Sequence, residues 1–392
     1  MQCLWLTLAD PEPAVNGQFI YSAGLISAIT AAGADLSIVG LARAGAPQRF
    51  DSKAIKWRLS QEQKRSKVIK LLSPLPLVSL ITVTPAIEQA IETCLATGEI
   101  DTVVFDSIAV GWALPVLLRQ KHQKQLKIVY LGHNHETTVA QQIASSSAGM
   151  KGAGLALDAL KVAKLERHLV TKADLVTAND PADCERFAEM APRRPVIFLP
   201  PGYSGSIVPG RQLNGSLPRR AVVVGSFNFP PKRHSLEAFL TCATPLLAAA
   251  KIELQIVGGA EAGYLDFLRQ RFPTIEFTGF VEDVKPFMAN ARVALVPDLL
   301  GGFKLKAFDY VFNRIPILAI DIAVPGTPLE DGRGIRLFSS HQALAEGLVN
   351  IIDDVSVLNA QQNMAFDACI NCSAWGSIGE RLFNSIRSIP AA

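Results

Sequence analysis

Short apolar runs alternate with longer segments of mixed polarity along the whole chain. Apolar runs of this length are typical of strands that are buried on both faces, and the segments between them are long enough for helices. In the first half, strands are predicted at 2–8, 35–39, 102–105, 127–131, 175–178 and 196–199, with helices at 18–32, at 108–122 and after Asp180-Pro181. This alternation predicts an α/β fold with a doubly wound parallel sheet and helices on both faces.

The alternation stops at Pro200-Pro201-Gly202 and restarts near Arg220, which indicates a linker. Beyond it, strands are predicted at 221–224, 253–257, 274–277, 293–296 and 316–320, and helices at 236–249, 261–271, 284–290, 305–313 and 374–389. We therefore expect two Rossmann-like domains, at 1–205 and 206–373, and a last helix at 374–392 that crosses back to the first. Ligands of such sheets bind at the carboxyl ends of the strands, so a site is expected in a cleft between the domains, lined by His133 and Asp309.

Composition and charge exclude several classes of protein. The chain has 392 residues, of which 49% are hydrophobic, and a net charge of +3, which is too small for a dedicated nucleic-acid binder. The first residues lack the basic and apolar regions of a signal peptide, and no stretch reaches the ~20 apolar residues of a membrane-spanning helix. A cytoplasmic location is therefore predicted. The basic segment 53–70 is compatible with a helix on the inner, anionic membrane surface or with a solvated helix at the domain edge.

The segment from Asp298 to Ile320 carries a candidate anion site. Gly301-Gly302 follows a predicted strand, and a helix is expected to begin near Phe303. Free backbone N–H groups and the helix dipole favour an anion at such a position. Lys306 adds positive charge, and Asp309, three positions later, is expected on the same helix face. The alternative is a glycine-rich turn with a solvated Lys–Asp pair.

The second candidate site is His133-Asn134-His135-Glu136, which follows another predicted strand. Its alternative is a polar loop that caps a helix. Two histidines and one carboxylate in a row do not fix the geometry of a metal site, and the chain lacks a paired-aspartate motif. No metal site is predicted.

Taken in order, these motifs resemble those of GT-B glycosyltransferases, in particular the retaining enzymes of family 4. In that family a segment E-G-F-G-(x)4-E precedes a turn and a strand. Gly301-Gly302-Phe303-Lys304 and Asp309 stand at the corresponding positions, and 313–319 matches the turn and strand. Other matching segments are 17–24, 133–136, 224–227 with Lys232 after it, 277–281, and Trp375 followed by a helix.

The resemblance implies a GT-B fold and a retaining, metal-independent transfer of a sugar from a nucleotide-diphosphate donor. It implies no cofactor, and an acceptor that is a glycan or lipid-linked, as in bacterial surface polysaccharide synthesis. The implied site residues are His133, Lys232 and Asp309 as catalytic, Gly17, Gly225, Ser226, Phe280, Val281, Gly301, Gly302, Phe303 and Lys306 as donor-binding, and Tyr21, Asn134, His135 and Glu136 on the acceptor side.

Two departures from the family pattern keep alternatives open. Gly301 replaces a glutamate that contacts sugar hydroxyls, and Ser226 replaces an arginine beside the diphosphate. One alternative is a catalytically degenerate homologue that acts as a binding or scaffold subunit. Another is a sugar-nucleotide epimerase of related fold, which would need more acid–base residues than Asp106, His133 and Glu136.

Overall fold

The computed structural model describes residues 1–14, 16–63, 66, 72–299 and 305–390. The chain forms two compact units, one of Met1–Gly202 together with Ala374–Ala392, and one of Tyr203–Ser373. Among the described helices, none combines the length and the apolar character needed to cross a bilayer.

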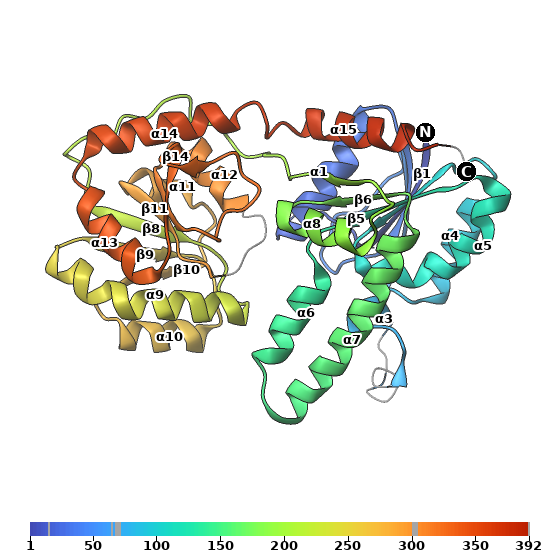
Figure 1. The fold of residues 1–392 in the computed structure, drawn as a ribbon, viewed down its shortest axis with the longest axis horizontal. Coiled ribbons are helices and arrows are strands. Elements are labelled where there is room, and N and C mark those ends of the chain that lie inside the picture. The colour runs from blue at the N-terminus through green and yellow to red at the C-terminus, as the bar shows by residue number, and fades with distance from the viewer. Residues whose placement is uncertain (15, 64–65, 67–71, 300–304, 391–392) are drawn as a thin grey trace. The chain divides into compact units, whose positions relative to one another are not determined.

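The first unit contains a seven-stranded parallel sheet in the order β3-β2-β1-β4-β5-β6-β7 (Figure 1). Its strands are β1 (Gln2–Ala9), β2 (Asp35–Leu41), β3 (Ile55–Ser60), β4 (Thr102–Asp106), β5 (Lys127–Gly132), β6 (Leu175–Ala178) and β7 (Val196–Phe198). Successive side chains of β1 point to opposite faces: Leu4 and Leu6 join one apolar cluster, and Cys3 and Trp5 join the other. The sheet is therefore buried on both faces, as the continuous apolar runs predicted.

The helices of this unit are α1 (Gly17–Ala31), α3 (Leu77–Leu80), α4 (Pro85–Ala96), α5 (Leu114–Lys124), α6 (Glu136–Ser145), α7 (Gly149–Lys172), α8 (Pro181–Met190) and α15 (Trp375–Arg387), with a 3-10 helix, η1, at Ile108–Ala113. The C-terminal helix α15 packs on α1. At Gly24 of α1, an added Cβ would lie 2.2 Å from the Trp375 indole, so only glycine leaves room for that ring.

The second unit repeats the architecture with the order β10-β9-β8-β11-β12-β14-β13. Its strands are β8 (Arg220–Val224), β9 (Glu253–Val257), β10 (Glu276–Gly279), β11 (Val293–Val296), β12 (Ile317–Ile320), β13 (Glu330–Asp331) and β14 (Gly334–Phe338). Its helices are α9 (Pro230–Ala249), α10 (Ala262–Arg271), α11 (Lys285–Ala289), α12 (Leu305–Phe312), α13 (His341–Ile351) and α14 (Val355–Cys369). In both sheets the third, second, first and fourth strands of the unit are neighbours. The strand order thus reverses between β1 and β4 and between β8 and β11, where ligands of such sheets bind.

One predicted element is wrong. The basic segment 53–70 was expected to be helical, but Ile55–Ser60 forms the edge strand β3, with Trp57 packed against the core and Arg58 on the outside. This stretch forms a strand rather than a helix because its apolar and basic residues alternate with a period of two. Residues 64–65 and 67–71 lie outside the described part of the chain.

Candidate active site

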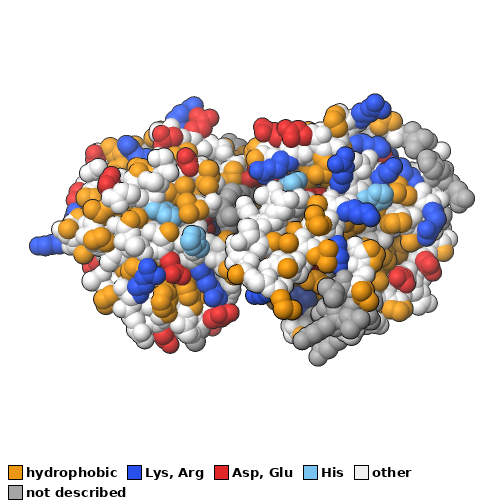
Figure 2. Space-filling model, turned by 60° about the horizontal axis from the view of Figure 1, so that its bottom comes forward, with side chains coloured by type: hydrophobic (Ala, Val, Ile, Leu, Met, Phe, Trp, Pro, Cys, Tyr) orange, Lys and Arg blue, Asp and Glu red, His pale blue; other side chains and the backbone are white. Residues whose placement is uncertain are grey.

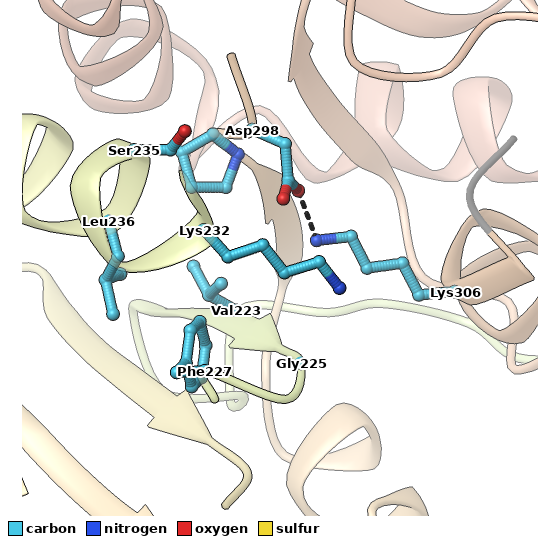
Figure 3. A pocket seen from close by; sticks show the side chains of 9 residues that line it. Val223, Gly225, Phe227, Lys232, Ser235, Leu236, Asp298 and Lys306 are labelled. Atoms are coloured by element: carbon cyan, nitrogen blue, oxygen red, sulfur yellow. Dashed lines mark hydrogen bonds and ion pairs between the residues drawn. The ribbon is translucent and has the colours of Figure 1, made fainter. Parts of the chain in front are cut away.

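A pocket of the second unit lies at the carboxyl edge of its sheet, where β8 and β11 end. Its lining combines apolar groups at the base with three charged side chains, contributed by α9, by the residues after β11 and by α12 (Figure 3). The lining residues are Val223, Gly225, Phe227, Lys232, Ser235, Leu236, Pro297, Asp298 and Lys306. The fold therefore brings the predicted residues Gly225, Lys232 and Lys306 together.

Lys306 is neutralised by an aspartate of the same pocket. Its Nζ donates to Oδ2 of Asp298 at 2.5 Å, and both side chains are largely buried. The alternative of a solvated Lys306–Asp309 pair is thus wrong, because Lys306 turns to the loop after β11 while Asp309 contacts Tyr203 of the linker. Asp298 was missed by the sequence prediction. Its signal is an acidic residue close behind an apolar run, at the carboxyl end of a predicted strand.

Lys232 is the second cation of the pocket, and its side chain extends toward Lys306 (Figure 3). Within the described residues, no hydrogen bond or ion pair to its Nζ is found. Burial, and next the charge of Lys306, lower the pKa of Lys232, while Asp298 opposes the shift. A half-buried ammonium group without an acidic partner of its own favours the approach of an anion.

The loop after β11 is fixed by groups from two helices. The Leu299 amide donates to Oγ of Ser235 on α9 at 3.1 Å, and Nε2 of His341 on α13 lies 2.8 Å from the Pro297 carbonyl oxygen. The end of β8 is held by α12, because the Val224 amide donates to the Tyr310 hydroxyl at 2.8 Å. Hydrogen bonds from the surrounding helices therefore fix the two loops that form the pocket walls.

Asp309 lies on α12 outside this pocket lining. Burial raises the pKa of its carboxyl group to about 6, although a hydrogen bond with Tyr203 and the charge of Lys285 oppose the shift. The carboxylate is thus half-buried and titrates close to neutral pH. Tyr203, from the linker, also packs its ring on Phe312 of the same helix at 4.5 Å.

Three more of the predicted donor-binding residues follow strands of the same sheet. Ser226 is exposed after β8, Phe280 after β10 is 80% exposed, and Val281 is partly buried against the core. An exposed phenylalanine at a strand end offers a face on which a planar base can stack. Gly301, Gly302 and Phe303 lie outside the described residues.

In the first unit, His133 follows β5 and binds a buried carboxylate at the end of β4. The Nε2 atom of His133 donates to Oδ1 of Asp106 at 2.6 Å, and Trp5 Nε1 donates to Oδ2 at 3.0 Å. Burial alone would raise the pKa of Asp106, but hydrogen bonds from His133, Trp5 and Ser22 outweigh it and lower the pKa. Asp106 therefore fixes the imidazole orientation and leaves Nδ1 as the ring nitrogen for a substrate.

The rest of this motif begins α6. His135 caps the helix, accepting from the Thr138 amide through Nδ1 at 3.3 Å, and Asn134 Nδ2 donates to Glu136 Oε1 at 3.3 Å. Burial and then the charge of Glu166 raise the pKa of Glu136 to about 7. His135 is therefore a structural cap rather than an open acceptor-side group, whereas Glu136 titrates near neutrality.

Glu166 of α7 holds this helix start and was absent from the predicted site. Its carboxylate is fully buried and accepts from the amides of Glu136 and Thr137 at 2.7 and 3.0 Å. A glutamate in the middle of a long helix gives no sequence signal for such a contact.

Tyr21 and Gly17 are the remaining predicted site residues of the first unit. Tyr21 is buried, its hydroxyl donates to the Leu199 carbonyl oxygen at 2.6 Å, and its ring meets the His133 ring edge-on at 5.2 Å. It therefore supports His133 and does not present its hydroxyl to an acceptor. Gly17 is exposed in the first turn of α1, which Asn16 caps.

A comparison with protein families decides the class of the second unit. The model of the family described as Glycosyl transferases group 1 matches residues 218–354. Residues 218–354 are therefore similar to a group 1 glycosyltransferase domain. This match confirms the glycosyltransferase prediction, and the group 1 domain contains Lys232, Asp298, Lys306 and Asp309. No curated protein matches the chain in sequence.

Solved structures show the fold of the whole chain, including both units. Sucrose-phosphate synthase from Thermosynechococcus elongatus matches with a TM-score of 0.72 at 19% identity, over 99% of this chain and 98% of that one. Anabaena HepE, in complex with UDP and glucose, matches with a TM-score of 0.63 at 16% identity, over 99% and 100%. WaaG, a glycosyltransferase involved in lipopolysaccharide biosynthesis, matches with 0.63 at 13% identity, over 98% and 100%. These matches confirm that the group 1 domain is one half of a GT-B fold.

Proposed function

We propose that this glycosyltransferase moves a sugar from a nucleotide-diphosphate donor to a glycan or lipid-linked acceptor, with retention of configuration and without a metal ion. The observation that carries the proposal is Lys232 at the strand-order reversal of the group 1 domain, a half-buried cation that has no acidic partner of its own among the described residues. The UDP complexes of HepE support a nucleotide donor, and the stated role of WaaG supports a surface polysaccharide acceptor.

The proposed chemistry follows from the charges of the pocket. When the bond between sugar and diphosphate breaks, negative charge develops on the leaving oxygen, and a fixed cation lowers the energy of that state. Lys232 supplies this charge, while Lys306, balanced by Asp298, contributes less. Asp309 accepts hydrogen bonds from the ribose hydroxyls, and Nδ1 of His133, the ring nitrogen that does not bind Asp106, contacts the transferred sugar.

Turnover is the direct test of this function. We expect release of the nucleoside diphosphate from one of a panel of nucleotide sugars, and a product whose anomeric configuration by NMR equals that of the donor. A product with inverted configuration would contradict retention. Epimerised nucleotide sugar without diphosphate release would favour the epimerase alternative.

Donor binding should depend on pH through Asp309. Because its pKa is raised to about 6, the carboxylate that accepts the ribose hydroxyls forms only as the pH rises through 6. UDP-glucose affinity, measured by calorimetry, should therefore increase from pH 5 to 7 and then level off. Asp309→Asn should weaken binding by about tenfold or more and flatten this dependence.

The intact nucleotide sugar is the right probe, since its diphosphate has no group that titrates near pH 6.

The carboxyl group of Asp309 affects the stability of the fold with the opposite sign. Its folded pKa lies above the unfolded value of 3.8, so its contribution is full below that value and is lost as the pH rises through 6. Asp321→Asn, an exposed carboxylate of the same unit, is the control. An unchanged pH profile in Asp309→Asn would exclude this role.

Chelation should leave turnover unchanged, because the proposed charge stabilisation comes from Lys232. Within the described residues, no three His, Cys, Asp or Glu side chains are grouped to hold a metal ion. Activity before and after EDTA, with Mg²⁺ or Mn²⁺ added back, measures this. Loss on chelation and recovery with the metal would show that a cation carries the leaving-group charge.

The scaffold alternative rests on Gly301 and Ser226, which stand where the family has a glutamate and an arginine. It predicts that the protein binds a nucleotide or a glycan without turnover. A thermal-shift screen with nucleotides and nucleotide sugars, followed by the turnover assay on each binder, separates the two.

A further inference from the structure

Helices α6 and α7 form a hairpin in the first unit, with their connecting turn at the end away from the sheet (Figure 1). The helix α7 has 24 residues, about 36 Å at ~1.5 Å per residue. Its N-terminal end lies away from the sheet (Figure 1). The near end holds Glu166, which binds the start of α6 at Glu136 and Thr137.

Large apolar side chains lie on the outer face of α7. Met150 is 94% exposed, Leu160 68% and Leu157 44%, and their spacings of seven and three residues place them on one side of the helix. Leu77 and Val78 of α3 are exposed as well. They lie beside α7 because the Leu77 amide donates to Asp158 Oδ1 at 2.9 Å.

The charge of the hairpin has one sign on its exposed surface. Lys164 and Arg167 continue the line of exposed positions toward the sheet, and Lys151 is exposed near the turn. The carboxylates turn inward: Glu166 is fully buried, Asp158 is half-buried and accepts from α3, and Glu136 is half-buried. No carboxylate of residues 136–172, all of which are described, is exposed.

We infer that this face of the α6–α7 hairpin docks on an anionic lipid surface. An apolar stripe flanked by basic residues places its side chains at the boundary of the acyl chains, while the cations meet anionic headgroups. A second copy of the chain would bring two faces of the same charge together, so charge complementarity favours lipid. The inference goes beyond the donor chemistry, and it assigns the membrane contact to α7 rather than to 53–70.

Vesicle binding tests the inference with the full chain. The protein should sediment with phosphatidylglycerol–phosphatidylcholine vesicles, and less so as salt rises, because exposed charges are screened within ~10 Å at 0.1 M. Lys164→Glu with Arg167→Glu should lower partitioning by at least about tenfold. Met150→Ser with Leu160→Ser should lower it as well, without restoring any binding to neutral vesicles. These side chains are exposed, so the melting temperature should change little.

The matched control reverses two exposed lysines of the other basic segment, Lys53→Glu with Lys56→Glu, and should retain vesicle binding. Loss of binding in this control but not in the α7 variants would overturn the assignment. So would equal binding to pure phosphatidylcholine, no binding by the wild type, or a dimer in sedimentation that only the α7 variants abolish. Lys232→Ala should bind vesicles like the wild type, so failure of the donor site and failure of this surface remain distinguishable.

Discussion

Replacing Lys232 with alanine should lower the turnover rate by ~10²–10³-fold while donor affinity changes much less. The ammonium group is half-buried and lies beside the ion-paired Lys306, and no acidic partner of its own is found in the part of the chain that the structure describes. Its charge is therefore most useful when the diphosphate leaves, and less so when the donor only binds. Steady-state kinetics with the nucleotide sugar that turns over would measure both quantities.

Two variants of the same domain provide the comparison. Lys306→Ala should affect turnover less, because Asp298 already balances that charge. Arg336→Ala removes an exposed cation of β14 and should leave the kinetics unchanged. Normal turnover in the Lys232→Ala protein, or a larger loss in Lys306→Ala, would show that the assignment of the leaving-group contact is wrong.

Asp106→Asn should lower turnover by about 100-fold or more, although the side chain keeps its size. The carboxylate now accepts from His133 Nε2 and so leaves Nδ1 unprotonated in the neutral ring. An asparagine amide can donate to Nε2 and select the other tautomer, which presents a donor at Nδ1 where an acceptor stood. Trp5 retains a hydrogen-bond acceptor, so the loss in the free energy of unfolding should stay near 1–3 kcal/mol.

The pH dependence of stability separates the role of Asp106 in orienting His133 from its role in stabilising the fold. The folded pKa of Asp106 is lowered from 3.8, so its contribution to stability is complete above that value and is lost as the pH falls through the folded pKa. Asp106→Asn should remove this acid-side dependence in urea unfolding. Asp174→Asn is the matched control, because Asp174 pairs with Lys121 at 2.6 Å before β6, at the amino edge of the same sheet. Equal losses of turnover in both variants would point to a purely structural effect.

The strands were predictable because most of them are buried on both faces. Runs such as Val103–Phe105 and Val293–Val296 are fully buried, and their short length favours a strand over a helix. The edge strand β3 was not predicted because only one of its faces is partly buried and its basic residues belong to the longer basic segment 53–70. Helix α9 begins at Pro230, six residues before the predicted start, since two prolines fit the first turn of a helix and do not break it.

The positions of single site residues were easier to predict than the partners that their side chains bind. Gly225, Lys232 and Lys306 lie at one pocket because each follows its own strand to the same sheet edge. The partner of Lys306 was not predictable, because i+3 spacing on a helix favours Asp309 and only the loop geometry selects Asp298. Likewise, His133 and Asp106 meet because β4 and β5 are neighbours, which no short-range pattern encodes.

The return of α15 to the first unit makes that unit discontinuous in the chain. Ile378, Leu382 and Ile386 belong to the same apolar cluster as Tyr21, Leu25 and Ile29 of the first thirty residues. During synthesis, the ribosome must therefore complete the whole second unit before the first can cover this side of its sheet. A fragment that stops at Gly202 would expose the surface around Gly24 on which Trp375 packs. Cutting the chain once therefore does not yield two independent halves.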